Sequence, residues 1–231
     1  MFCAHCGSKL QEAVLDCPSC GRKRPDSSPP PASQLGERLK GSSVDALTSL
    51  KTLLLDPVGG LSTAYSDLGR DRATAAGAVL CVGFALVASL GFTLGASRWL
   101  GSMLALTGNS GFTVFVKSFA ALLVIPAGFV AAGLGVRKLL KSSEGVAADL
   151  FIAGMALAPL GIAFLLSGLL GAANVEVAML LFLFAYTYLI LMLYGGLTSV
   201  GHLNARAAAP AVPVVLLVAG WLTKIVFAAL F

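Results

Sequence analysis

Charged residues are scarce in this sequence. Only 12% of the 231 residues are Asp, Glu, Lys or Arg, whereas 57% are hydrophobic and the mean hydropathy is +0.88. A soluble globular domain carries about 25% charged residues, and half of that supply cannot cover a water-facing surface of this size. The composition therefore excludes an ordinary soluble enzyme and predicts a membrane protein.

The residues that most enzymes and ion-coupled transporters need are also scarce. The chain has two histidines, no His-Glu-x-x-His helix, no Gly-x-Ser-x-Gly elbow and no glycine-rich phosphate loop. No Asp or Glu lies in the middle of an apolar segment, since Asp149 and Glu176 are at segment ends, whereas a transporter normally keeps an ionisable group inside the membrane. Lys117 and Lys224 lie near segment ends, where they can reach the interface. We therefore expect a protein that is not an enzyme.

Long apolar runs make up most of the remaining chain and predict an all-α integral membrane fold. A membrane-spanning helix needs about 20 predominantly apolar residues. Five segments meet this requirement, at about 73–96, 113–136, 150–172, 177–200 and 208–231. Together they predict a five-helix transmembrane bundle within a membrane domain over 43–231.

A shorter helix is predicted at 43–55, ahead of the first span. Its leucines share one broad face and its Asp, Ser and Thr residues share the other. This pattern is typical of a helix that lies in the membrane interface, and equally of one packed against the bundle.

Basic residues predict the orientation of the spans. Lys and Arg cluster before the first span and again in the loop at 137–141, whereas the loop at 171–175 carries no charge. Because positive residues stay on the cytoplasmic side, we expect a cytoplasmic N-terminus and an exterior C-terminus. The net charge of +5 then reflects membrane flanks, and no nucleic-acid partner is expected. Residues 1–24 have no apolar run and do not resemble a signal peptide.

Four cysteines near the N-terminus form two Cys-x-x-Cys-Gly knuckles. The ligands that this pattern predicts are Cys3, Cys6, Cys17 and Cys20. Four thiolates satisfy tetrahedral Zn2+, so residues 1–24 are predicted to form a structural zinc ribbon, followed by a Pro- and Ser-rich linker over 25–42. A redox dithiol or a disulfide pair is the alternative, which a reducing cytoplasm disfavours. The ribbon is interpreted as a docking module for a protein partner, or as a self-contained cytoplasmic cap.

Small residues recur in the third span and predict close helix packing. The stripe consists of Ala147, Gly154, Gly161 and Gly168. Their spacing of seven drifts by only about 20° per step on a helix, so they share one face that admits a neighbouring backbone. That neighbour is another helix of the chain or of a partner, which leaves a homo-oligomer possible. Pro126 and Pro159 interrupt two spans and predict kinks, which in a transporter can mark a path.

Two parts of the chain resemble known families. The knuckles CAHCG and CPSCG resemble the short zinc ribbon at the N-terminus of many bacterial membrane proteins. About residues 45–230 resemble the Yip (Ypt-interacting protein) domain family in the segment LLLDPVGGL, the five spans and the orientation. Eukaryotic Yip proteins are Golgi and ER membrane proteins that engage Rab-type GTPases. For this chain the resemblance implies the fold and topology, and no functional residues beyond the four cysteines.

These observations favour a multi-pass protein of the bacterial cytoplasmic membrane that serves as a scaffold or adaptor, with the membrane domain in the lipid bilayer. Its cytoplasmic zinc ribbon would dock a protein partner. The alternative is a transporter, channel or lipid-handling protein with a cavity near the two prolines. A tightly packed, glycine-lined bundle would favour the scaffold, and a polar cavity at mid-membrane would favour the transporter.

Overall fold

The computed structural model describes residues 56, 59–99, 110–140, 145–170 and 174–230. The chain divides into two compact units, Met1–Arg38 and Leu39–Phe231, and every described residue belongs to the second. The predicted zinc ribbon, the linker and the helix at 43–55 lie outside the described residues.

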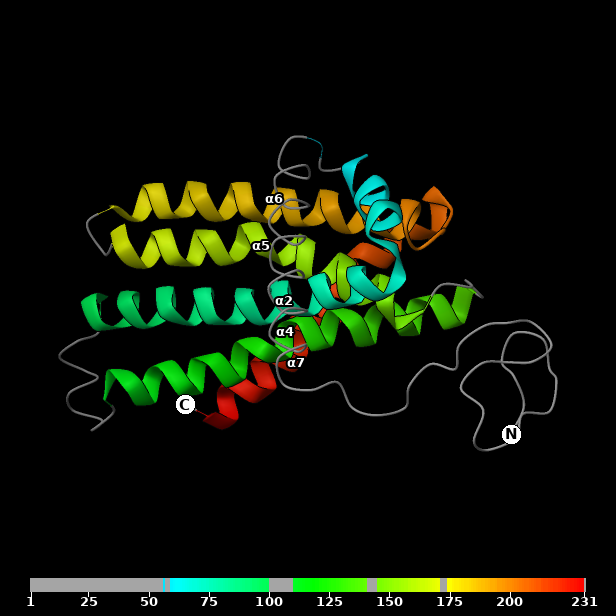
Figure 1. Ribbon diagram of the computed structural model, residues 1–231. Helices are drawn as coiled ribbons and strands as arrows, with labels where there is room; N and C mark the ends of the chain where they lie inside the picture. The colour runs from blue at the N-terminus through cyan, green and yellow to red at the C-terminus, as the bar shows by residue number, and fades with distance from the viewer. Residues whose placement is uncertain (1–55, 57–58, 100–109, 141–144, 171–173, 231) are drawn as a thin grey trace, which may run out of the picture. The chain divides into compact units, whose positions relative to one another are not determined.

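Five helices form the described part of the chain (Figure 1). They are α2 (Gly60–Trp99), α4 (Gly111–Leu140), α5 (Val146–Leu170), α6 (Val175–Ser199) and α7 (Ala205–Leu230). Each is long and apolar enough to cross a membrane. Over the described residues, the prediction of an all-helical fold with five helices long and apolar enough to span a membrane is therefore confirmed. Helices α4 and α5 contain Pro126 and Pro159 within their length.

The helices α6, α5, α2 and α4 lie side by side in that order, and α7 packs against α4 (Figure 1). The most extensive contact joins α2 to α5. Helix α5 is the central one, since 67% of its most apolar window is buried, compared with 22% for α7. Its first 16 residues, from Val146 to Gly161, are almost all buried.

A short amphipathic segment precedes the first predicted span and was not expected from the sequence. Within α2, Gly69 has φ 69° and ψ 165°, so the segment before it forms a separate helical piece. Leu61 and Ala64 are buried, and Tyr65 packs on Phe151 with ring centroids 5.5 Å apart. The spacing of these apolar residues, three and four apart, is the signal that predicts such a helix.

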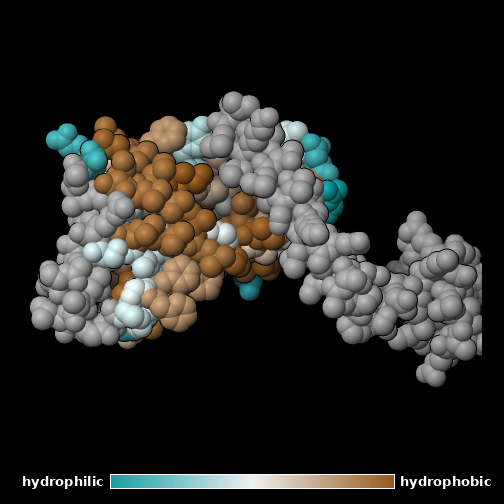
Figure 2. All heavy atoms as spheres, turned by 60° about the vertical axis from the view of Figure 1, so that its left-hand side comes forward, coloured by the Kyte–Doolittle hydropathy of each residue, from teal (hydrophilic) through white to brown (hydrophobic). Residues whose placement is uncertain are grey.

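The outer surface of the bundle is apolar. Figure 2 shows a broad brown, hydrophobic area over the described helices, with teal, hydrophilic groups at its margins. Large apolar side chains are strongly exposed on α6 and α7, including Leu180 at 65%, Leu217 at 72% and Trp221 at 66%. Exposure of so continuous an apolar surface is unfavourable in water, whereas it is compatible with lipid.

Candidate functional site

The contact between α2 and α5 is built on glycines at three successive levels. A Cβ added at Gly77 would lie 2.7 Å from backbone atoms of Leu150 and Phe151, and one at Gly154 would lie 2.5 Å from the carbonyl oxygen of Gly77. Real Cβ atoms essentially never approach so closely. At this level the two backbones therefore touch, and only glycine fits on either helix.

The second and third levels follow at steps of seven residues along both helices. At the second level the α2 residue is Phe84, and at the third level two glycines meet again. A Cβ at Gly161 would lie 3.1 Å from the ring carbon Cδ2 of Phe84, and one at Gly168 would collide with the carbonyl group of Gly91. The prediction that the glycine stripe of the third span faces another helix is confirmed, and that helix is α2.

The register also fixes the relative direction of the two helices. Gly77, Phe84 and Gly91 meet Gly154, Gly161 and Gly168 in the same order, so α2 and α5 run parallel. The first and third spans of a chain that crosses the membrane back and forth must run in the same direction, as α2 and α5 do. We call this contact the α2–α5 seam. In the sequence, the spacing of Gly77 and Gly91 by fourteen residues, two steps of seven, indicates the face of α2 that forms this seam.

Two buried serines within the bundle bond to their own helices. Ser89 and Ser118 are fully buried, and each hydroxyl donates to a carbonyl of the preceding turn, Leu86 at 2.9 Å and Phe115 at 3.0 Å. These bonds satisfy the two hydroxyl groups, so neither of them needs a polar cavity beside it.

A buried ion pair joins the end of α4 to the start of α5. The Arg137 guanidinium bonds to the Asp149 carboxylate, and both side chains are almost completely buried, at 2% and 3% exposure. Arg137 Nη2 also donates to the Gly145 carbonyl oxygen at 2.7 Å, and that oxygen accepts the Ala148 N–H at 3.1 Å. Arg137 thereby ties the end of α4 to the first turn of α5.

Gly133 makes room for this pair, and Gly145 makes room for the neighbouring Arg70. A Cβ at Gly133 would lie 2.6 Å from the Oδ1 atom of Asp149, and a side chain at Gly145 would collide with the guanidinium of Arg70. Arg137 entered the sequence analysis as a loop cation, and this was wrong: it lies within α4 and is 2% exposed. The void beside Asp149 has a volume of about 10 Å³, which is about the smallest that can hold one water molecule.

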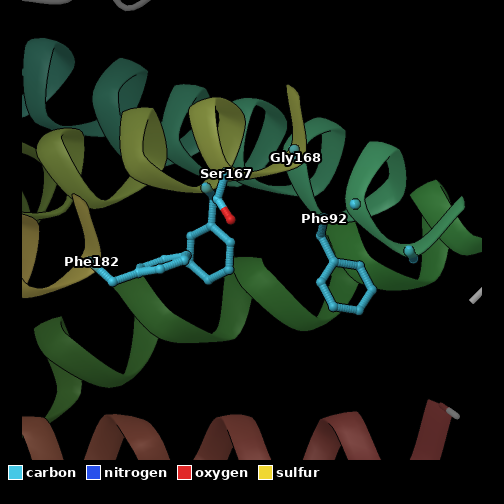
Figure 3. A pocket seen from close by; sticks show the side chains of 8 residues that line it. Phe92, Ser167, Gly168 and Phe182 are labelled. Atoms are coloured by element: carbon cyan, nitrogen blue, oxygen red, sulfur yellow. The ribbon is translucent and has the colours of Figure 1, made fainter. Parts of the chain in front are cut away.

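An apolar cleft lies at the other end of the α2–α5 seam (Figure 3). Its volume is about 260 Å³. The lining residues are Gly91, Phe92, Gly95 and Ala96 of α2, Phe164, Ser167 and Gly168 of α5, and Phe182 of α6. Figure 3 shows the rings of Phe182 and Phe92 on two sides of the cleft, with the Ser167 hydroxyl between them.

The predicted zinc ligands Cys3, Cys6, Cys17 and Cys20 lie outside the described residues. Among the residues that the structure does describe, no group of three or more His, Cys, Asp or Glu side chains could hold a metal ion. Cys81 is buried in α2, with its Sγ atom 3.8 Å from the Leu150 carbonyl oxygen.

Comparison with family models, with curated proteins and with solved structures finds no match to this chain. The resemblance to zinc ribbons and to the Yip family therefore stays a prediction that rests on the sequence.

Proposed function

We propose that this protein is a multi-pass scaffold or adaptor of the bacterial cytoplasmic membrane, with the Yip-like topology that the sequence suggests. In this proposal the helical bundle anchors a cytoplasmic zinc ribbon, which binds one Zn2+ through Cys3, Cys6, Cys17 and Cys20 and docks a protein partner. The C-terminus lies on the exterior side.

The packing of the α2–α5 seam is the observation that carries this proposal. Backbone contacts at Gly77, Gly91 and Gly168 leave no room for a solute between the two helices that make the largest contact. The void beside the ion pair holds about 10 Å³, and the clefts at the other end of the seam and along the first half of α6 are lined almost entirely by apolar groups. A bundle packed in this way suits an anchor better than an alternating-access transporter, whose site lies between elements that move apart.

The charged groups inside the bundle also suit a static role. The Asp149 carboxylate bonds to the Arg137 guanidinium, and this pair joins the end of α4 to the start of α5. A proton or ion relay needs ionisable groups that face a hydrated cavity, and the apolar side chains around this pair, such as Phe129 and Ile152, do not provide one. We therefore interpret the pair as a fastening of the bundle.

The experiment uses a photo-crosslinking amino acid at position 22, directly after the second knuckle, in cells that express the full chain. We expect a discrete crosslinked protein with the parent chain. The adduct should disappear with Cys17→Ser, because a small ribbon does not fold without its metal. Gly83→Ala, in the membrane domain, is the matched control and should keep the adduct.

Two results would contradict the adaptor. The first is an adduct of equal yield with Cys17→Ser, which would mean that a folded ribbon is not what the partner recognises. The second is solute flux into proteoliposomes that contain a chain lacking residues 1–24, which would favour the transporter.

A further inference from the structure

Two charged side chains of opposite sign lie on the outer surface of the bundle, on α6 and α7. Glu176 is the second residue of α6, Lys224 lies six residues before the last residue of α7, and both are exposed. Within the part of the chain that the structure describes, neither side chain forms an ion pair or a hydrogen bond. Ionisable residues in membrane spans usually face other protein or a water-filled cavity, so these two charges indicate a contact that one chain alone does not provide.

The two charges lie on different edges of the bundle. Helices α6 and α7 are joined at one end by the short connection at 200–204, and toward the other end they separate (Figure 1). The first half of α6 then forms one edge of the bundle, and the second half of α7 lies at the other edge, beside α4. An ion pair between Glu176 and Lys224 therefore needs two copies of the chain.

An apolar cleft of about 640 Å³ runs along the first half of α6, and we call it the α6 cleft. Its lining residues are Glu176, Met179, Leu180, Phe182 and Leu183. Leu180 and Leu183 are each 65% exposed, so the apolar part of the cleft is open to whatever lies beside the bundle. Glu176 lies at the end of the cleft that is nearest the start of α6.

A row of three exposed residues on α7 has the complementary character. Leu217, Trp221 and Lys224 are spaced by four and three residues, so they share one face of the helix, and we call them the α7 ridge. Leu217 is 72% and Trp221 66% exposed. The Lys224 ammonium group lies 5.7 Å from the centre of the Trp221 ring. The ridge therefore presents two large apolar side chains followed by a cation.

The order of residues along the ridge matches the order along the cleft. Because α6 and α7 are successive spans, they run in opposite directions in every copy. With Trp221 between Leu180 and Leu183, Lys224 lies one turn nearer the start of α6, on the side of Glu176. The lysine side chain can extend further toward the membrane interface, where it meets the carboxylate. Apolar groups then face apolar groups, and the two opposite charges face each other.

We propose that two copies of this chain form a dimer in which the α7 ridge of each copy packs into the α6 cleft of the other. A two-fold axis along the membrane normal reverses the row α6, α5, α2, α4 in the second copy, so the α6 edge of each copy faces the α7 edge of its partner. Glu176 pairs with Lys224 of the other copy at both contacts. This inference goes beyond the adaptor role and does not depend on the zinc ribbon.

The ion pairs determine which surfaces associate in this dimer. Helices in lipid associate through close packing and polar contacts, since the lipid is as apolar as the helix surfaces. Many apolar side chains are exposed on the bundle, but the α6 cleft and the α7 ridge each add a charge to them. Reversal of one charge would leave like charges facing each other at both contacts.

The test measures the dimer fraction of the full chain in a mild detergent, by light scattering across a dilution series. We expect the parent to be a dimer, and Glu176→Lys or Lys224→Glu alone to weaken it at least about tenfold. An equal mixture of the two variants should restore the dimer, because a mixed pair has opposite charges at both contacts. Lys138→Gln, at the other end of the bundle, is the control and should not change the dimer.

A crosslinking experiment in membranes keeps the proposal testable if a charge-reversed chain does not fold. Two tagged, otherwise cysteine-free chains carry Leu183→Cys and Leu217→Cys, and mild oxidation should join them by a disulfide. Val146→Cys, exposed at the other end of the bundle, replaces Leu183→Cys as the control and should give little product with Leu217→Cys.

Three results would overturn the dimer. A parent chain that is monomeric at every concentration would mean that lipid covers the α6 cleft. A dimer that neither charge reversal weakens would use another surface. Crosslinking that is no more efficient from position 183 than from position 146 would show that the cleft and the ridge do not meet.

Discussion

Gly77→Ala adds a single methyl group at the first level of the α2–α5 seam, where the two backbones touch, and we expect it to destabilise the bundle. The new Cβ would lie 2.7 Å from the Leu150 carbonyl oxygen and from the N and Cα atoms of Phe151. All three are backbone atoms of a buried helix, so no side chain can turn aside. The only relief is a separation of the two helices.

The size of the effect follows from that separation. Non-bonded carbon atoms pack best at about 3.5–4.0 Å, so the helices must part by about 1 Å locally. A gap of 0.5–1 Å already removes roughly a quarter to a half of the dispersion energy of each contact it opens, and the levels at Phe84 and Gly91 lie on the same rigid helices. We expect a loss of about 1–3 kcal/mol, as for other overpacked cores. Gly161→Leu should cost a similar amount, whereas Leu165→Met should be nearly neutral.

The control is Gly83→Ala, the same chemical change on the same helix. An added Cβ at Gly83 meets nothing within 4 Å, and alanine favours the helix over glycine by up to about 1 kcal/mol. This variant should be as stable as the parent or slightly more stable. The assay is thermal unfolding of the purified chains in one detergent. If Gly77→Ala and Gly83→Ala unfold at the same temperature, the backbone contact at the seam does not exist as described.

The remaining predictions concern zinc, topology and the ion pair. The purified chain should contain one zinc ion. Cys17→Ser should remove that ion and unfold residues 1–24, since structural zinc contributes roughly 10–16 kcal/mol to folding in small zinc modules. A metal analysis that finds no zinc in the parent chain would refute the ligand set. Single cysteines at positions 143 and 173 in a cysteine-free chain should react with an impermeant reagent from opposite sides of the membrane, and reaction from one side would refute the five-span topology. Asp149→Asn should cost about 3–5 kcal/mol of stability in detergent, because it leaves the buried Arg137 without its carboxylate. Replacement of both partners, by Arg137→Met with Asp149→Leu, should recover most of that loss, and no recovery would mean that the pair has a role beyond mutual neutralisation.

The number and type of the helices followed from the sequence because lipid imposes a simple requirement. Every backbone polar group within the hydrocarbon must be satisfied, so a long apolar run becomes a helix whatever its neighbours are. Hydropathy could not give the position of each helix in the bundle. The five windows have nearly equal mean hydropathy, 2.1 to 2.2, although 67% of one and 22% of another is buried.

The spacing of small residues, unlike hydropathy, indicates which face of a helix is packed against another helix. Between helices in lipid, close approach of backbones replaces the hydrophobic effect as the source of association, so the stripe through Gly154 and Gly161 identified a packed face. It could not name the partner, because an apolar face of a second chain would satisfy it equally. The matching period on α2, from Gly77 to Gly91, provides that answer when the two patterns are compared.

A count of charges along the sequence does not separate a buried charged residue from an exposed one, and the buried ion pair is an example. Arg137 and Lys138 are adjacent and were counted alike, but on a helix they point about 100° apart. Arg137 continues the buried stripe of Phe129 and Gly133, at intervals of four, whereas Lys138 is exposed. A helical wheel extended past the apolar segment would have separated them. The predicted orientation does not depend on the difference, since Lys138 at the end of α4 and the lysine at 141 still make this side more positive than the uncharged loop at 171–175.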